Sequence, residues 1–257
     1  QEWEQKNLDD MREKKKNLVK DKIIFLERLL RTKHSALAAN LSSGGEGNQT
    51  SSGRLPGEDE LALQEMSGEA AARLRQSYAD RQTTLSQDKE FDELQQVRQR
   101  LPVAEYREQF LRSVARSPVV VVSGATGSGK TTQVPQYVLE NALEGPPEAP
   151  LPQIIVTEPR RISAVSVAKR VSLEMGDPPG GPGSRDSLVG YQIRLEKKVS
   201  SSTRLLFCTV GVLLRQLQQG LGALAKVTHI FIDEVHERSA DCDLLMLLLR
   251  QVRASRP

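Results

Sequence analysis

The spacing of apolar and polar positions changes near Pro118. Over residues 2–37, apolar side chains recur at intervals of three, four and seven, which predicts a charged helix within residues 1–40. Similar patterns over 60–87 and 88–100 predict a helical lead-in spanning about residues 61–100, which ends before Pro102. Apart from one interruption, we therefore expect the first hundred residues to be mainly helical.

The interruption covers residues 41–60 and is composed largely of Ser, Gly, Asn and Pro. Such a segment cannot bury enough apolar surface to offset the backbone entropy that folding would cost. We expect a disordered linker here.

After Pro118, short apolar runs alternate with helical patterns. The runs span Val119–Ser123, Ile154–Thr157, Arg204–Thr209 and His229–Asp233. The helical patterns span Lys130–Leu143, Ile162–Met175, Val210–Gln218 and Asp241–Val252, and a Gly- and Pro-rich loop is expected over 176–187. Strands that alternate with helices predict an α/β domain, with a parallel sheet covered by helices on both faces, over residues 101–257.

Composition narrows the class of protein only slightly. The excess of 36 Lys and Arg over 33 Asp and Glu gives a net charge of +3, too small to establish a nucleic-acid partner. Cys208 and Cys242 lie among apolar residues and lack metal-ligand spacing, which favours buried reduced thiols. The apolar runs are too short to span a membrane, and no signal peptide opens the chain. These features predict a cytoplasmic protein with no membrane partner, and a nuclear location stays open.

The segment GATGSGKT, Gly124–Thr131, follows an apolar run and precedes a helical pattern. It fits G-x-x-x-x-G-K-[ST], in which a glycine-rich backbone wraps a phosphate chain at a helix N-terminus. We expect Lys130 to neutralise the β- and γ-phosphates and the Thr131 hydroxyl to bind Mg²⁺. The predicted nucleotide-binding residues are Gly124, Ala125, Thr126, Gly127, Ser128, Gly129, Lys130, Thr131 and Thr132.

The segment IFIDEVHERS, residues 230–239, ends an apolar strand with two adjacent carboxylates. Nucleotide hydrolysis needs one acid for the metal and another for water, so Asp233 would hold Mg²⁺ and Glu234 would orient or deprotonate the attacking water. We predict Thr131, Asp233 and Glu234 as the metal site, and Lys130, Asp233 and Glu234 as catalytic residues. A lone histidine is usually structural, but the place of His236 in Asp-Glu-x-His adds it to the catalytic candidates.

Asp233–Ser239 resembles motif II of the DEAH-box RNA helicases of superfamily 2. Three further segments resemble family motifs in the family's order: Thr157–Ile162 resembles motif Ia, Gly190–Glu196 a segment close to the RNA path, and Thr209–Arg215 motif Ib. Histidine, rather than aspartate, as the last letter of motif II favours the DEAH-box group over the DEAD-box group. The resemblance covers about residues 98–257 and is highly specific.

The resemblance implies a RecA-like P-loop NTPase domain that uses ATP and Mg²⁺ and holds RNA largely through its phosphates. It implies RNA contacts at Arg160, Arg161, Arg194, Thr209 and Arg215, and an arginine stacked on adenine at Arg170. The implied function is that of an ATP-dependent RNA helicase, a monomeric motor that couples ATP hydrolysis to remodelling of RNA or ribonucleoprotein.

Two residues depart from the usual family pattern. Ala125 stands where the phosphate loop usually has Glu, and Glu158 stands where motif Ia usually has Gln. Neither change removes a phosphate, metal or water ligand. Glu158 is expected to add a negative charge near the RNA backbone and so to weaken contact there.

The segments QRLPV, GPGSRDSLVGYQIRLE and STRLLFCTVGVLLRQLQ are most similar to two DEAH-box subgroups. One assists the small ribosomal subunit in scanning structured messenger leaders, and the other carries ubiquitin-associated and zinc-finger modules. The charged helical lead-in favours the first. This resemblance implies a role in translation initiation, with the small ribosomal subunit or initiation factors as partners.

The chain begins with Gln1 rather than Met, which suggests a fragment, and stops before the family's Ser-Ala-Thr motif, second motor domain and arginine fingers. We therefore expect the isolated chain to bind nucleotide weakly, to hydrolyse it barely and to unwind nothing.

Two other classes of function compete with the helicase interpretation. The first is another P-loop NTPase, such as a small-molecule kinase or a GTPase, although no guanine-reading Asn-Lys-x-Asp follows residue 131. The second is a scaffold that binds RNA or the ribosome through its N-terminal helices. A degenerate enzyme would normally have lost Lys130, Asp233 or Glu234, and all three are present.

Overall fold

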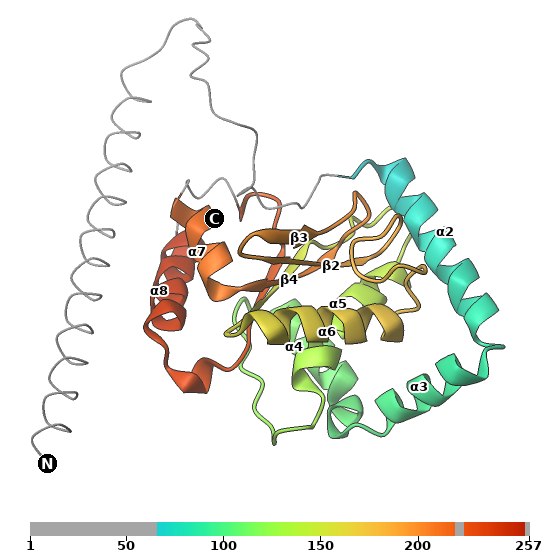
Figure 1. Ribbon diagram of the computed structural model, residues 1–257, viewed down its shortest axis with the longest axis horizontal. Helices are drawn as coiled ribbons and strands as arrows, with labels where there is room; N and C mark the ends of the chain where they lie inside the picture. The colour runs from blue at the N-terminus through green and yellow to red at the C-terminus, as the bar shows by residue number, and fades with distance from the viewer. Residues whose placement is uncertain (1–65, 219–223, 255–257) are drawn as a thin grey trace, which may run out of the picture. The chain divides into compact units, whose positions relative to one another are not determined.

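The structure is a computed structural model that describes residues 66–218 and 224–254 (Figure 1). These residues belong to one compact unit, Glu58–Pro257. The charged helix expected over residues 1–40 and the linker expected over 41–60 lie outside the described residues.

A five-stranded sheet of order β3-β2-β4-β1-β5 forms the centre of this unit. Its strands are β1 (Ile154–Glu158), β2 (Val189–Ile193), β3 (Glu196–Lys198), β4 (Leu205–Thr209) and β5 (His229–Ile232). Four strands are parallel, and β3 pairs antiparallel with β2 at the edge. The predicted α/β fold with a mainly parallel sheet is confirmed, although β2 and β3 were not predicted as strands.

Helices surround the sheet: α5 (Lys130–Leu143), α6 (Arg161–Glu174), α7 (Val210–Gln218) and α8 (Ala240–Ala254). Their bounds agree with the predicted helices to within two residues. From β1, α6 leads across the sheet to β2, whereas α7 leads from β4 in the opposite direction to β5. Because such crossovers are right-handed, α6 and α7 lie on opposite faces. None of the helices in the described ranges is long and apolar enough to cross a membrane.

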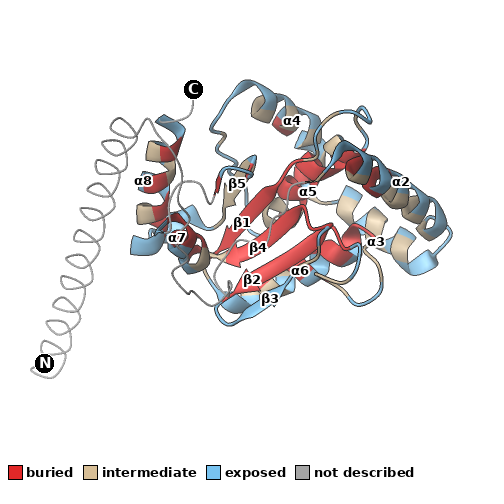
Figure 2. Cartoon of the chain, turned by 90° about the horizontal axis from the view of Figure 1, so that it is seen from above, coloured by how far each residue is buried: buried red, intermediate tan, exposed pale blue. Residues whose placement is uncertain are grey.

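The core lies between the sheet and the helices α5 and α6. Figure 2 shows β1, β2 and β4 as buried strands, and every residue of β1 and β2 is buried. Leu139 of α5, Ile154 of β1, Ala168 of α6 and Phe207 of β4 are fully buried in this core. The covered strands are continuously apolar at their starts, as expected for a sheet protected on both faces.

Among the described residues, four helical elements precede the phosphate-loop segment: α2 (Gly68–Leu85), α3 (Lys89–Gln99), the 3-10 helix η1 (Pro102–Tyr106) and α4 (Arg107–Arg116). Arg75, only 8% exposed, fastens α2 to the end of α5 by donating hydrogen bonds to the carbonyl oxygens of Ala142, Pro147 and Ala149. Gln82 Nε2 similarly donates to the Met175 carbonyl oxygen, at 2.8 Å, just beyond α6. The lead-in helices therefore hold the C-terminal ends of both α5 and α6.

The strand predicted over Val119–Ser123 is wrong, because this segment has no regular structure. Val119 is 62% and Val121 86% exposed, and only Val120 packs against the core. A strand needs a neighbour that pairs with its backbone N–H and C=O groups. Within residues 66–218 and 224–254, β5 is the last strand on its side of the sheet, and the apolar segment does not pair with it.

Candidate active site

The parallel strands end at one edge of the sheet, where the predicted acidic residues and several of the predicted RNA-contact residues follow. Asp233 comes directly after β5, Arg194 directly after β2, Arg160 two residues after β1, and Thr209 is the last residue of β4. In the register, Glu158 at the end of β1 lies beside Thr209. The connections that follow β1 and β4 leave toward opposite faces of the sheet. Open α/β sheets bind their ligands at the carboxyl ends of the strands, at the point between two such connections.

The glycine-rich loop leads into the N-terminus of α5, whose first residue is Lys130. Lys130 Nζ donates hydrogen bonds to the carbonyl oxygens of Gly124, at 2.6 Å, and Ala125, at 2.8 Å, and lies 3.3 Å from Ser128 Oγ. The ammonium group is therefore held inside the curve of the loop by neutral acceptors. Phosphate oxygens at this position would be stronger, charged partners for the same group.

Gly129 joins the loop to α5 in a conformation that only glycine adopts without strain. Its φ of 92° is left-handed, and a Cβ added here would lie 2.9 Å from Leu101 Cδ1 and 3.1 Å from Val103 Cγ1. The loop is thus pressed against the residues that begin η1. Gly127 also has a positive φ, of 79°, but no atom lies near its missing side chain.

The phosphate loop and the acidic strand end, 102 residues apart in sequence, meet through a hydrogen bond from Thr131 Oγ1 to Asp233 Oδ2. The Asp233 backbone N–H donates to the Thr157 carbonyl oxygen at 3.1 Å, which continues the pairing between β5 and β1. Asp233 is thereby held by the sheet on one side and by the loop on the other. The predicted metal ligands Thr131 and Asp233 lie side by side.

Glu234 and Arg238 both have left-handed backbone conformations, with φ values of 52° and 49°. Such conformations are uncommon for residues other than glycine and often mark functional turns. The turn directs the two acids differently: Asp233 faces Thr131, whereas the Glu234 side chain is 42% exposed and its Oε2 lies 3.2 Å from His236 Nδ1. His236 is largely exposed and contacts Glu234 rather than the phosphate loop.

Glu158 lies beneath this site and is only 2% exposed. Burial, with the nearby negative charges of Asp233 and Glu234, raises the pKa of Glu158 to about 8. Its Oε1 atom has no hydrogen-bond partner among the described residues. Glu158 was expected to place a negative charge near the RNA backbone, but its side chain is buried and its raised pKa disfavours that charge at neutral pH.

The arginines predicted to contact RNA are exposed, and three of them lie around the ends of β1 and β2. Arg160 Nη2 pairs with Glu237 Oε1 at 3.3 Å, which links motif Ia to motif II. Arg161 Nη2 donates to the Arg194 carbonyl oxygen at 3.1 Å. Arg215 projects from α7, the helix that begins directly after Thr209.

Arg170, predicted to stack on adenine, is held by a buried network that the sequence did not reveal. Its Nε donates at 2.6 Å to Oε1 of Glu174, four residues later on α6. Glu174 Oε2 in turn accepts hydrogen bonds from Gln133 and Gln136 of α5, both at 2.7 Å. One feature of the sequence could have indicated this network: α5, which is mostly buried and apolar, contains two glutamines three residues apart.

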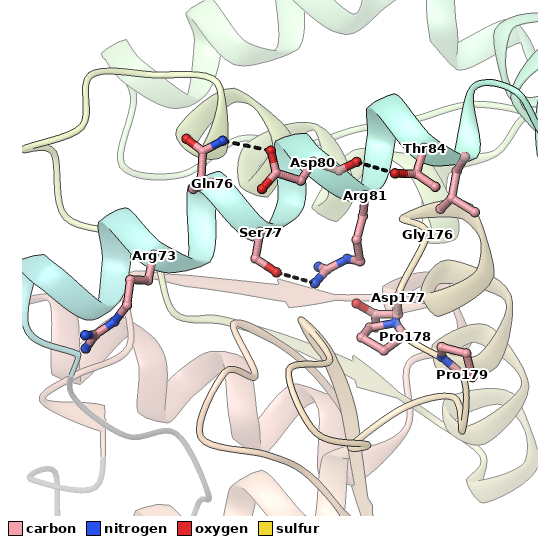
Figure 3. A pocket seen from close by; sticks show the side chains of 11 residues that line it. Arg73, Gln76, Ser77, Asp80, Arg81, Thr84, Gly176, Asp177, Pro178 and Pro179 are labelled. Atoms are coloured by element: carbon pink, nitrogen blue, oxygen red, sulfur yellow. Dashed lines mark hydrogen bonds between the residues drawn. The ribbon is translucent and has the colours of Figure 1, made fainter.

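A separate pocket of about 590 Å³ lies between α2 and the loop after α6 (Figure 3). It is lined by Arg73, Gln76, Ser77, Asp80, Arg81, Thr84, Leu85, Gly176, Asp177, Pro178 and Pro179. Figure 3 shows Arg81 donating to Ser77 Oγ, a 3.0 Å hydrogen bond within α2. None of the predicted nucleotide or RNA ligands lines this pocket.

A glycine-rich loop before a helix, paired acids at a strand end and exposed arginines at the same edge of the sheet are the arrangement typical of P-loop NTPases. Residues 105–255 match the family DEAD/DEAH box helicase, and the chain belongs to this family. The fold is therefore that of a RecA-like helicase domain, as predicted.

Individual relatives are similar to most of the chain. ATP-dependent RNA helicase DHX29 of Mus musculus is 47% identical over 196 residues, which are 76% of this chain and 14% of that protein. DHX57 of Homo sapiens is 51% identical over 169 residues, 66% of this chain and 12% of that protein. DExH-box ATP-dependent RNA helicase DExH1 of Arabidopsis thaliana is 47% identical over 178 residues, 69% of this chain and 17% of that protein. The chain thus spans less than a fifth of the length of these relatives.

Proposed function

We propose that this chain is the ATP-binding motor domain of an ATP-dependent RNA helicase, which couples ATP hydrolysis to remodelling of RNA or ribonucleoprotein. The observation that carries the proposal is the hydrogen bond between Thr131 and Asp233, which brings the phosphate loop to the acidic end of β5. The proposal is supported by the family, which uses ATP, and by relatives such as DHX29 and DExH1 that are named as ATP-dependent RNA helicases.

In this proposal, the phosphates of ATP lie in the loop from Gly124 to Thr132. The N-terminus of α5 and the loop amides attract their negative charge, and Lys130 exchanges its carbonyl partners for phosphate oxygens. The neutral carbonyl contacts that now hold Lys130 are weaker than charge-assisted ones, so the exchange favours the bound nucleotide.

Mg²⁺ fits the oxygen atoms that converge here, because it prefers one or two carboxylates together with substrate phosphates and water. Thr131, Asp233 and Glu234 would hold it, directly or through water, and the bound ion would neutralise phosphate charge. In the described part of the chain, no group of three or more His, Cys, Asp or Glu side chains is arranged to hold a metal alone. A site completed by phosphates is consistent with that finding.

Hydrolysis requires one carboxylate that activates the attacking water, while another carboxylate stays with the metal. Glu234, which is exposed and lies beside His236, suits the first role, and His236 suits the task of orienting it. On the base side of the nucleotide, Arg170 would stack on adenine through its planar guanidinium.

The RNA strand is proposed to cross the same edge of the sheet. Arg160, Arg161 and Arg194 are exposed there, Thr209 ends the neighbouring strand, and Arg215 is exposed on the helix α7 that follows it. The surface ion pair of Arg160 with Glu237 is of a kind worth at most about 1 kcal/mol, so a phosphate can replace it.

The remaining parts of the proposal concern the whole protein. They are a charged helix over 1–40, a linker over 41–60, a helical lead-in over 61–100, the motor over 101–257, a monomeric state and a cytoplasmic location. QRLPV and the later segments resemble the DEAH-box subgroup that assists the small ribosomal subunit. This resemblance supports a role in translation initiation, with the small ribosomal subunit or initiation factors as partners. Since the chain spans under a fifth of its relatives, we expect little hydrolysis from it alone.

The test is RNA-stimulated ATP hydrolysis and duplex unwinding by the full-length protein that contains this chain, compared with Glu234→Gln. Removing a positioned general base typically lowers the rate by about 10²–10⁴-fold, and we expect that loss with ATP binding retained. Glu108→Gln, an exposed residue of α4, is the matched control and should hydrolyse ATP at the normal rate. Hydrolysis by Glu234→Gln at the same rate as the control would contradict the proposal.

A further inference from the structure

A buried arginine from the lead-in connects three helices behind the phosphate loop. The Arg98 side chain, on α3, is 11% exposed. Its Nη2 donates to Glu140 Oε1 at 2.6 Å, and its Nε donates to Gln133 Oε1 at 2.8 Å, so it contacts α5 at two points. Its Nη1 also donates to the backbone carbonyl oxygen of Glu174 at the end of α6, at 3.3 Å.

Glu174 extends this network to the side of the site where the base is expected. Its side chain is 2% exposed, and Arg98 Nε lies 3.7 Å from its Oε2. The same carboxylate accepts from Gln133 and Gln136 through Oε2 and from Arg170 through Oε1. Two arginines, Arg98 and Arg170, and two glutamates, Glu140 and Glu174, therefore balance their charges in a largely buried space. Removing Arg98 would leave the two carboxylates facing each other with less compensation.

The residues that follow Arg98 touch the phosphate loop itself. The Val103 backbone N–H donates to the Ser128 carbonyl oxygen at 3.1 Å. The side chains of Leu101 and Val103 fill the space beside Gly129, where an added Cβ would meet them at 2.9 and 3.1 Å. The segment from Arg98 to Val103 therefore supports the loop from behind by a backbone hydrogen bond, by apolar contact and by the Arg98 network.

We propose that the segment Arg98–Val103 is a positioning element of the nucleotide site, with Arg98 as its principal residue. It holds the phosphate loop and α5 in place directly and holds Arg170 through Glu174. This inference rests on the proposed function and assigns a role in nucleotide binding to residues 98–103, which precede the residues matched by the family. Because its side chain donates to Gln133, Glu140 and Glu174, Arg98 acts on the site through these residues.

The test measures equilibrium binding of a fluorescent ADP, with Mg²⁺, to the full 257-residue chain. Loss of an outer-shell partner of a metal ligand costs about 10–100-fold in metal affinity or activity, and by analogy we expect Arg98→Met to bind ADP at least about tenfold more weakly. Arg98→Lys keeps the charge but cannot reach Gln133, Glu140 and Glu174 together, so it should recover only part of the affinity. The matched control is Arg112→Met, an exposed residue of α4 outside the segment, which should bind like the unmodified chain.

Displacement of the fluorescent ADP by pyrophosphate, which has no adenine, separates the effect on the phosphate loop from the effect on Arg170. Leu101→Ala loosens only the contact with the loop, so it should weaken ADP and pyrophosphate by the same factor. Arg98→Met disturbs both the loop and Arg170, so it should weaken ADP by more than pyrophosphate. A residue that only supported the fold would lower the unfolding temperature and leave this ratio unchanged.

The outcomes are distinct. If folded Arg98→Met and Arg98→Lys both bind ADP within twofold of the unmodified chain, Arg98 is a structural residue and the inference is overturned. If Arg98→Met does not fold, the affinity of Arg98→Lys for ADP and its ratio of ADP to pyrophosphate weakening decide in the same way. If Lys130→Ala binds as well as the unmodified chain, the proposed function fails instead, and the inference falls with it.

Discussion

Replacing the buried Glu158 with Gln should make the protein more stable at neutral pH. Its folded-state pKa of about 8 lies well above the ordinary 4.5 of a glutamate. The folded protein therefore binds this proton more tightly than the unfolded chain. The stabilisation associated with the proton is complete below pH 4.5 and is lost progressively as the pH rises toward 8. Glutamine has nearly the same shape and does not ionise in either state.

The size of the effect follows from the two pKa values. Between pH 5 and pH 7, the unfolded chain releases the proton while the folded chain keeps it, which is two pH units at about 1.4 kcal/mol each, or about 3 kcal/mol. For a unit of this size, 1 kcal/mol changes the unfolding temperature by about 2–4 °C. The advantage of Glu158→Gln over the unmodified chain should therefore be about 5–10 °C larger at pH 7 than at pH 5.

The assay is thermal unfolding followed by circular dichroism at a series of pH values between 5 and 8. The advantage of Glu158→Gln in unfolding temperature is compared between two pH values, which removes any cost of burying the glutamine amide that does not depend on pH. Glu108→Gln, on the exposed face of α4, serves as the control and should show no such trend. If the advantage of Glu158→Gln is the same at pH 5 and pH 7, Glu158 ionises as it would in water and its placement beneath the site is wrong.

Two further substitutions test the packing around the site. Gly129→Ala places a methyl group against Leu101 at a residue with a left-handed backbone conformation. We expect thermal unfolding to show a loss of about 1–3 kcal/mol of stability, together with weaker ADP binding. Unchanged ADP binding would show that the loop has room for the methyl group. Arg75→Met leaves the carbonyl acceptors at the end of α5 without their donor. This should cost about 2 kcal/mol of stability, measured as a lower unfolding temperature. ADP affinity should stay the same, because α5 is released at the end that lies away from the loop.

The parts of the fold that depend on local patterns could be predicted from the sequence. The bounds of α5 and α7 follow from apolar periodicity, and the end of β5 follows from the change from IFI to two acids. The apolar run at Val119–Val122 looked like a buried strand for the same reason. Apolar character alone does not supply a pairing partner, and in the described residues this run has none.

The parts that depend on distant contacts could not be predicted. Glu158 ends a strand that begins with three apolar residues and was expected to place its charge near the RNA backbone, but its side chain is buried in the folded chain. The network around Arg98 joins residues from α3, α5 and α6 that lie up to 76 positions apart. Pairings of this kind leave no periodic signal in one sequence, since each member alone looks like an ordinary surface charge.

The central claim is that the loop around Lys130 binds the phosphates of a nucleotide. The most direct test is equilibrium binding of fluorescent ADP, with and without Mg²⁺, to the unmodified chain, to Lys130→Ala and to the exposed control Lys89→Ala. We predict saturable binding that Mg²⁺ strengthens, that Lys89→Ala retains and that Lys130→Ala abolishes. Equal binding by Lys130→Ala and the unmodified chain, or no binding by the correctly folded unmodified chain, would contradict the claim.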